Sequence, residues 1–220
     1  MTSTLTHPPL RDVLDRLFAA AAHDDEQVTD LADPGAFLAA PHHERAESRA
    51  EVYMPISAAG GELLYALVRS ARPATVVEFG TSFGISTIYL AAAVSDNGTG
   101  HVYGSELSAT KLAAARDNLA AAGVADQVTL LPGDARRTLR EVPGPIGLVL
   151  LDGWKDACLD ALRALEPRLA PGALVVADDT TFDSMAGYLR YVRNPANGYV
   201  SVAFPVEDGM EISCWSRTRR

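Results

Sequence analysis

Three aspartates have the residue type and the spacing that metal-assisted chemistry needs. Asp152 directly follows the apolar run 147–151, and Asp178 and Asp179 follow a second apolar run, 173–177. Residues that follow parallel strands meet at the carboxyl edge of the sheet, where ligands bind in open α/β folds. Because like charges a few ångströms apart cannot all stay ionised without a cation, we predict that these carboxylates bind a hard divalent ion, most simply Mg²⁺. The alternative is that one or two of them cap helices or pair with lysines.

Lys155 is the candidate general base. It stands three residues after Asp152, so both side chains face the same way if a helix begins there. A lysine beside a divalent ion has its ammonium form disfavoured, which lowers its pKa toward the range of a general base. The competing interpretation is a salt bridge between Lys155 and either Asp156 or the aspartate cluster.

A glycine-containing turn, residues 80–84, follows the first predicted strand and could bind a nucleoside. It lacks the second glycine of the dinucleotide fingerprint, so a ligand without a pyrophosphate fits better and a dinucleotide dehydrogenase fits worst. Glu106 ends the next strand, 26 positions after Gly80, and we predict that it accepts hydrogen bonds from the two ribose hydroxyls. The alternative for Glu106 is an exposed acid at a strand end. Asp134 and Ala135 are further candidates, for the adenine side.

Alternating strands and helices must position these residues. We predict strands over 75–79, 101–105, 128–131, 147–151 and 173–177, and helices over 86–94, 109–122, 135–141 and 157–169. Gly123 and Gly172 are expected near helix ends. Residues 199–206 and 210–216 predict a terminal hairpin with a tight turn at 207–209. The fold class is therefore α/β: a doubly wound, mostly parallel seven-stranded sheet that ends in an antiparallel hairpin strand.

The N-terminal part predicts helices that accompany this core. Residues 1–9 are expected to be disordered, and helices are expected over 10–22, 27–38 and 57–70, with Pro34 near the middle of the second. The polar stretch 41–49 is expected to be a loop or an exposed helix. We therefore predict a single domain, 1–220, in which residues 1–70 form a helical accessory layer and 71–220 the core.

Composition excludes several classes of protein. A formal charge of −9 argues against nucleic acid as a partner. No signal peptide and no long uncharged apolar run is seen, so we expect a cytoplasmic protein without a membrane partner. Cys158 and Cys214 have no metal-site spacing and are expected in the core. The N-terminal helices would suit a homodimer, although the sequence leaves the oligomeric state open.

Taken together, these motifs resemble the catechol O-methyltransferase-like, metal-dependent class I S-adenosylmethionine methyltransferases. The resemblance covers residues from Tyr53 to the C-terminus. It rests on Glu78-x-Gly80-x-x-x-Gly84-x-Ser86, Glu106, Leu151-Asp152-Gly153-Trp154-Lys155-Asp156, Ala177-Asp178-Asp179 and Asp208-Gly209-Met210-Glu211.

The resemblance implies an O-methyltransferase that moves a methyl group from S-adenosylmethionine to a hydroxyl of a small catechol-like or vicinal-diol phenolic acceptor. It implies Lys155 as the base, Glu211 as a contact of the acceptor's second hydroxyl, and Asp152, Asp178 and Asp179 as metal ligands. It also implies a cofactor pocket formed by Ile56, Glu78, Gly80, Thr81, Ser86, Glu106, Ala135, Asp152 and Trp154.

Two positions depart from the family's pattern. Asp179 stands where many members have asparagine, which adds a negative charge to the metal site. Gly153 replaces a histidine that lies beside the adenine in the catechol enzymes, which removes a contact and leaves room. Since the N-terminal segment matches no pattern, the acceptor's identity is not implied. Two alternatives stay open: a metal-independent small-molecule methyltransferase, and a non-catalytic S-adenosylmethionine-binding protein.

Overall fold

The computed structural model describes residues 3–22, 24, 33–206 and 208–216, which build one seven-stranded sheet. Its order is β3-β2-β1-β4-β5-β7-β6, in which β1 to β5 are parallel and β7 runs antiparallel between β5 and β6. This arrangement confirms the predicted fold class. The strands are β1 (Thr75–Phe79), β2 (His101–Glu106), β3 (Val128–Pro132), β4 (Ile146–Leu151), β5 (Leu169–Ala177), β6 (Tyr199–Phe204) and β7 (Met210–Trp215).

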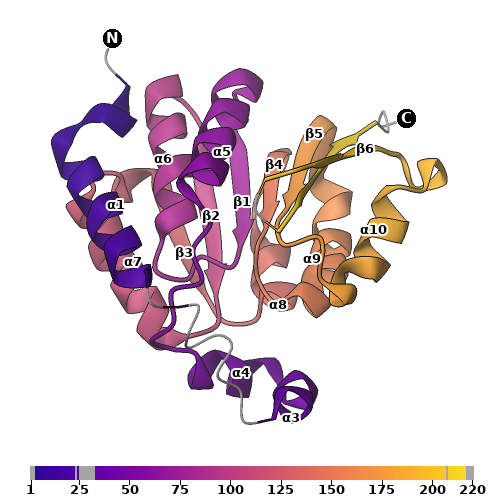
Figure 1. Cartoon of the computed structure of the whole chain (residues 1–220). Helices are drawn as coiled ribbons and strands as arrows, with labels where there is room; N and C mark the ends of the chain where they lie inside the picture. Colours follow the sequence, from indigo (N-terminus) through magenta and orange to yellow (C-terminus); the bar gives the residue numbers. More distant parts are fainter. Residues whose placement is uncertain (1–2, 23, 25–32, 207, 217–220) are drawn as a thin grey trace.

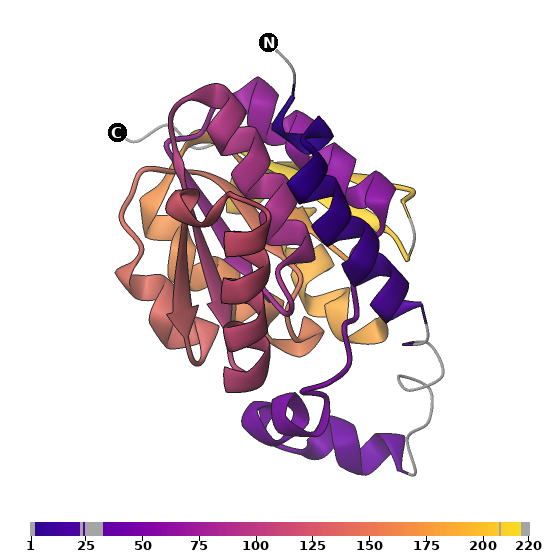
Figure 2. The same ribbon diagram turned by 90° about the vertical axis from the view of Figure 1, so that its left-hand side faces the viewer.

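Helices cover both faces of the sheet (Figure 1). One face carries α1 (Pro8–Ala21), α5 (Ala58–Ala71), α6 (Ile85–Asn97) and α7 (Ala109–Ala121). The other carries α8 (Ala135–Thr138), α9 (Cys158–Leu165) and α10 (Ala186–Val192). Two short helices, α3 (Pro34–Ala39) and α4 (His42–Ser48), form a separate lobe below the body in two perpendicular views (Figures 1 and 2). We call α3 and α4 the lobe.

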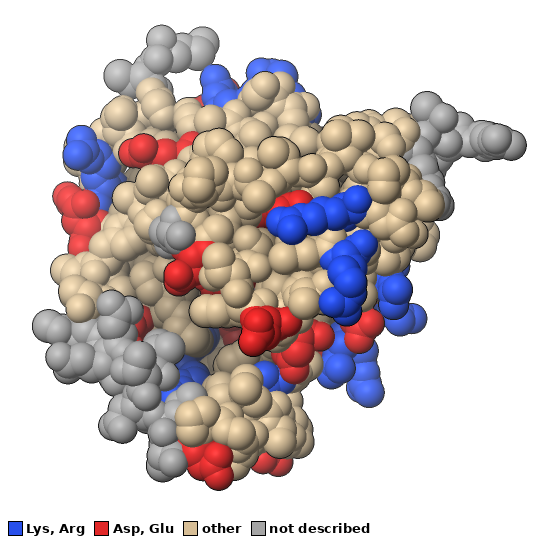
Figure 3. Space-filling view, turned by 45° about the vertical axis from the view of Figure 1, so that its right-hand side comes forward, with Lys and Arg blue, Asp and Glu red and all other residues tan. Residues whose placement is uncertain are grey.

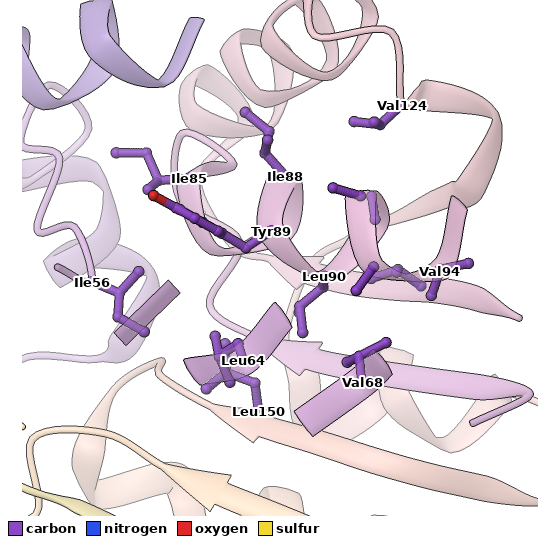
Figure 4. Close-up of a cluster of buried hydrophobic side chains, with 14 of the residues drawn as sticks. Ile56, Leu64, Val68, Ile85, Ile88, Tyr89, Leu90, Val94, Val124 and Leu150 are labelled. Atoms are coloured by element: carbon purple, nitrogen blue, oxygen red, sulfur yellow. The ribbon is translucent and has the colours of Figure 1, made fainter. Parts of the chain in front are cut away.

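The central strands are apolar on both faces because helices bury both of them. Leu148 and Leu150 of β4 have no exposed surface. Figure 4 shows Leu150 next to Leu64 of α5 in the core between the sheet and the helices. Gly61 allows α5 to approach α6 closely, since a Cβ there would lie 2.4 Å from the Tyr89 ring. Close packing of this kind fixes the strand ends that carry the site.

The structure corrects the predicted helix over 157–169. Here α9 ends at Leu165, a 3₁₀ turn covers Glu166–Arg168, and β5 begins at Leu169. Gly172 therefore lies inside β5 with φ of 80°, and the β4–β5 register shifts nearby. Gly172, which was predicted to lie near a helix end, instead lies where the pairing of β5 with β4 is irregular. Gly123 follows the end of α7, as predicted.

Helix α10 was not predicted. Tyr188 and Val192, four residues apart, are buried against the sheet, so a helical apolar pattern is present. The helix has seven residues and contains Gly187, and such a short element gives a weak periodic signal.

The N-terminus is more regular than predicted. Residues Thr4–Thr6 form a 3₁₀ turn, and α1 begins at Pro8. The Asp96 carboxylate accepts hydrogen bonds from Thr4 N (3.0 Å) and Ser3 Oγ (3.2 Å), which explains this order. Of the helix expected over 27–38, residues 27–32 lie outside the described residues, and Pro34 occupies the first position of α3 rather than a middle one.

No helix among the described residues is long and apolar enough to cross a bilayer. The single-domain boundaries, the cytoplasmic location and the homodimer stay predictions.

Candidate active site

A pocket of about 510 Å³ lies at the carboxyl ends of β1, β2 and β4, between the sheet and the lobe. Figure 3 shows a hollow between the body and the lobe, with acidic side chains along its upper edge. The strand order reverses between β1 and β4, which is where ligands bind in doubly wound folds. Most of the predicted cofactor residues line this pocket: Ile56, Gly80, Thr81, Ser86, Glu106, Ala135, Asp152 and Trp154.

The turn after β1 is shaped by Gly80. Its φ is 101°, and a Cβ at this position would lie 2.6 Å from the carbonyl oxygen of Asp152. Only glycine fits between the ends of β1 and β4 at this distance. The turn therefore presents bare backbone to the pocket, as predicted.

Glu78 is the one predicted cofactor residue that the structure removes from the pocket lining. Its side chain has no exposed surface and accepts hydrogen bonds from Thr81 Oγ1 (3.0 Å), Ser86 Oγ (2.7 Å) and Thr87 Oγ1 (2.5 Å). Burial raises the pKa of Glu78 to about 7, and the three hydroxyls act in the opposite sense. Glu78 therefore stabilises the turn after β1 and the start of α6 by accepting hydrogen bonds from their hydroxyl groups.

Glu106 is held at the pocket rim by backbone amides. The N–H groups of Ser82 and Ser108 donate to its two carboxylate oxygens, each at 2.8 Å. These bonds fix the orientation of the carboxylate, while each oxygen keeps a further lone pair for a ligand. The ribose role assigned to Glu106 stays a prediction that this geometry permits.

The three predicted metal ligands meet at one point. Asp152, Asp178 and Asp179 each offer a carboxylate oxygen, and these oxygens lie within 4.8 Å of one another. Asp178 is only 3% exposed, and its Oδ1 has no hydrogen-bond partner in the part of the chain that the structure describes. Burial and then the charges of Asp152 and Asp179 raise the pKa of Asp178 to about 8. Since an unsatisfied buried carboxylate oxygen is costly, this oxygen is suited to a cation.

Lys155 forms the competing salt bridge. Its Nζ lies 2.9 Å from Asp152 Oδ1 and 2.8 Å from Asp179 Oδ2. Burial acts to lower the pKa of Lys155, but the two aspartates outweigh burial and raise the pKa above its usual range. The expected lowering of the Lys155 pKa is therefore not found. The negative charge that Asp179 adds to the cluster is paired with the Lys155 ammonium.

Glu211 does not reach the pocket. It sits on β7 opposite Ala177, fully buried, and its carboxylate accepts hydrogen bonds from Arg193 Nε (2.9 Å), Arg193 Nη2 (2.7 Å) and Ser201 Oγ (2.6 Å). Neighbouring residues of a strand point to opposite faces, and this side chain points toward α10 and β6. The predicted contact with the acceptor stays a prediction, which this buried and bonded geometry does not favour.

Gly153 leaves no room beside the cofactor site. A Cβ on Gly153 would lie 2.3 Å from the ring of Phe79, which lines the pocket. Phe79 thus fills the space that we expected to be open, and the glycine is required by this ring.

Sequence reasoning missed the residues that fasten the lobe to the site. Arg45 of α4 donates to Asp156 Oδ2 at 2.7 Å, and its guanidinium lies 4.9 Å from the centre of the Trp154 ring. His42 Nε2 lies 3.2 Å from the same Asp156 oxygen. The acid that follows Lys155 therefore anchors the lobe over the pocket. Only the polar pattern of 41–49 hinted at this contact.

Lys111 of α7 is a second residue that was missed. It lines the pocket, it is 4% exposed, and its Nζ lies 5.6 Å from the centre of the Phe83 ring. A signal was present in the sequence: of the chain's 19 basic residues only Lys111 and Lys155 are lysines, and all the others are arginines.

Comparisons with known sequences find methyltransferases. Residues 77–180 match a family model described as a methyltransferase domain. "Probable O-methyltransferase Rv1703c" of Mycobacterium tuberculosis is 35% identical over 144 residues, covering 60% of this chain and 60% of that protein. Catechol O-methyltransferase B of Danio rerio is 30% identical over 167 residues, covering 70% of this chain and 62% of that protein. The chain thus spans less than two thirds of the length of these relatives.

Comparisons of structure agree. Cofactor-bound Rv0187 from MTB matches with a TM-score of 0.70 and 26% identity, covering 90% of this chain and 98% of that one. An O-methyltransferase from Bacillus cereus in complex with SAH shares the fold, with a TM-score of 0.65 and 19% identity over 91% of this chain and 100% of that one. These matches confirm the predicted resemblance and the fold.

Proposed function

We propose that this chain, a catechol O-methyltransferase-like class I methyltransferase in sequence and fold, transfers a methyl group from S-adenosylmethionine to a hydroxyl of a small phenolic acceptor with two adjacent oxygens. One observation carries this function: the unsatisfied Asp178 oxygen belongs to an aspartate cluster at the pocket that Glu106 lines at its other end. A cavity that can bind a nucleoside near Glu106 and a cation near Asp152 and Asp179 is suited to group transfer between two molecules bound side by side.

The nucleoside end is supported by the chain's own geometry. Gly80 allows close approach to the backbone, and Glu106 has both oxygens oriented by amides. The Bacillus cereus neighbour holds SAH, the demethylated product of S-adenosylmethionine, on the same fold. We assign the ribose hydroxyls to Glu106 on these grounds.

The donor set suits a hard divalent cation. Three carboxylates offer oxygens within 4.8 Å of one another, and the Asp178 oxygen has no other partner among the described residues. Carboxylate oxygens without nitrogen or sulfur ligands favour Mg²⁺ over Zn²⁺. Asp152, Asp178 and Asp179 would hold such an ion, which would supply a positive charge that lowers the pKa of a nearby acceptor hydroxyl.

Lys155 is assigned to receive the hydroxyl proton at Nζ. Its ammonium is stabilised by the salt bridges to Asp152 and Asp179. Neutralising these two carboxylates removes the charges that raise the pKa of Lys155, which returns the amine toward the range of a general base. Lys155 is therefore suited to act as a base only when the aspartate cluster is neutralised.

The outer wall of the pocket favours a flat, apolar acceptor. Leu38, Met54 and Phe182 are large apolar side chains that line the pocket and remain 65%, 40% and 49% exposed. The rings of Phe37 and Trp154 meet edge to face, 5.9 Å apart, on the same wall. Aromatic rings bury well on such a surface.

The test is a methyl-transfer assay on the full chain with S-adenosylmethionine and a panel of catechol and caffeoyl-type acceptors. We expect methylated product with added Mg²⁺, and loss of most turnover when EDTA removes the metal. Full activity in excess chelator would contradict the metal part of the proposal. Binding of S-adenosylmethionine by calorimetry, without methylation of any acceptor, would favour the non-catalytic alternative.

A metal-independent methyltransferase is the second candidate. It is favoured by Lys155, whose single ammonium bridges Asp152 and Asp179 and so reduces the need for a cation. This alternative leaves the Asp178 oxygen without a partner. The chelator arm of the same assay separates the two candidates.

A further inference from the structure

Lys111 is a buried cation whose ammonium has no hydrogen bond or ion pair within the described residues. It is 4% exposed, and no hydrogen bond or ion pair joins its Nζ to any residue of the described ranges 3–22, 24, 33–206 and 208–216. Its Nζ lies 5.6 Å from the centre of the Phe83 ring. The charges of Glu106, Asp24 and Asp152 act on it without a direct hydrogen bond. A lysine is almost never fully buried unless it is paired, so a ligand of the pocket should supply the acceptor.

Local structure fixes Lys111 at the nucleoside end of the pocket. Ser108 caps α7 and accepts the Lys111 backbone N–H at 3.3 Å, while its own N–H binds Glu106. Phe83 is in turn stacked on Tyr53 with ring centres 3.9 Å apart, which holds the ring beneath the ammonium. Glu106 and Lys111 therefore extend from one short segment into the same part of the cavity.

The choice of lysine is also informative. The chain uses arginine for every other basic residue, and its two lysines both line this pocket. A guanidinium is a broad, planar fork, whereas an ammonium is a compact point donor on a flexible stem. A small, deep acceptor such as a single hydroxyl oxygen is suited to the second.

On the basis of the proposed function, we infer that Lys111 is a cofactor-binding residue that donates a hydrogen bond to a ribose hydroxyl oxygen of S-adenosylmethionine. A ribose hydroxyl both donates and accepts. Its proton goes to the Glu106 carboxylate, and its lone pairs need a donor, which Lys111 Nζ supplies. Glu106 and Lys111 together recognise the sugar through one acceptor and one donor.

Titration calorimetry on the full chain tests this inference with two probes that share the ribose. S-adenosylhomocysteine carries the amino-acid group, and 5′-methylthioadenosine lacks it. We expect Lys111→Met to weaken both by the same factor, about 10- to 100-fold, because a hydrogen bond from a charged donor is lost. Lys111→Arg should regain only part of the affinity, because a broad guanidinium fits a single hydroxyl oxygen poorly, and the control Arg116→Met, an exposed cation on the same helix, should change neither.

Two results would overturn the ribose assignment. Weakening of S-adenosylhomocysteine alone would mean that Lys111 binds the amino-acid carboxylate, and unchanged affinity for both probes would mean that it only packs on Phe83. If the wild-type chain binds neither probe, the proposed function fails instead.

A measurement on the wild-type chain guards against a variant that does not fold. With ¹³C-labelled lysine the chain has only two sets of ε-CH₂ signals, and Lys155→Met assigns them. Adenosine should shift the Lys111 signal, and an unshifted signal would overturn the inference.

Discussion

Two buried acids, one on β7 and one directly after the neighbouring strand β5, differ in their hydrogen-bond partners. Glu211 of β7 pairs with Ala177 of β5, and Asp178 follows Ala177 directly. Both carboxylates are at most 3% exposed. Burial acts to raise the pKa of Glu211, but Arg193 and Ser201 outweigh it and lower the pKa, whereas burial and two acidic neighbours raise the pKa of Asp178 to about 8.

The difference between Glu211 and Asp178 lies in their partners rather than in their burial. The oxygens of Glu211 accept from donors of the chain itself, so Glu211 stabilises the fold and is unavailable to a ligand. Asp178 keeps an oxygen that no donor satisfies. A buried acid indicates a binding site when its hydrogen-bonding capacity is incomplete and its cluster reaches a cavity. Asp178 itself does not line the pocket, but its neighbours Asp152 and Asp179 do. Four predictions test this contrast.

The largest effect is expected for Asp178→Ala. Removing a proposed metal ligand should lower kcat/KM about 1,000-fold, since metal stabilisation of the transition state is worth several kcal/mol. Response to added Mg²⁺ should disappear in steady-state assays. Asp160→Ala, an exposed acid outside the pocket, is the control and should keep full activity. Wild-type rates in Asp178→Ala would remove Asp178 from the site.

Lys155→Met should lower kcat about 100-fold, because a positioned general base contributes roughly 10²–10⁴. Unlike Asp178→Ala, this variant should still bind Mg²⁺, which calorimetry can measure. Loss of metal binding together with activity would mean that Lys155 only organises the aspartates through its salt bridges.

Glu211→Gln should change stability rather than activity. The variant weakens the bonds to Arg193 and Ser201, and we expect a loss of about 1–2 kcal/mol, limited because Arg193 is half exposed. Thermal unfolding measures this loss against Glu141→Gln, an exposed acid, as the control. A tenfold fall in kcat with an unchanged melting temperature would restore a functional role for Glu211.

The last prediction concerns the dependence of stability on pH. The pKa of Asp178 is about 8 in the folded chain and about 4 in the unfolded chain, so between these values the folded state binds more protons and its stability falls as pH rises. In metal-free buffer at pH 8, Asp178→Asn should raise the melting temperature by about 2–4 °C for each kcal/mol relieved. The gain should vanish near pH 4. Equal melting curves at both pH values would contradict the raised pKa.

Much of the fold could be predicted because its signals are local. Strand β1 has the predicted bounds, and β2, β3 and β4 differ by one residue at one end. Buried parallel strands are continuous apolar runs, and long helices repeat their pattern several times. The start of β5 and the helix α10 escaped prediction because short or irregular elements depend on packing against the sheet.

The site was predictable where strand ends determine it. Asp152, Asp178 and Asp179 meet because neighbouring parallel strands end at one edge. The burial of Glu211 could not be predicted, because its orientation depends on which face of β7 it occupies and on Arg193, a residue 18 positions away. Lys111 was missed because its burial depends on the contact of α7 with the turn after β1.

By itself, the sequence determined the doubly wound sheet and the gathering of three carboxylates at its edge, since the alternation of apolar runs and helices leaves few other topologies. The tertiary structure alone decided which acids are satisfied and which are not. Donors such as Arg193, Lys155 and Ser86 come from other elements or turns of the chain than the carboxylates they bind. Which donor meets which acid therefore depends on how the elements pack.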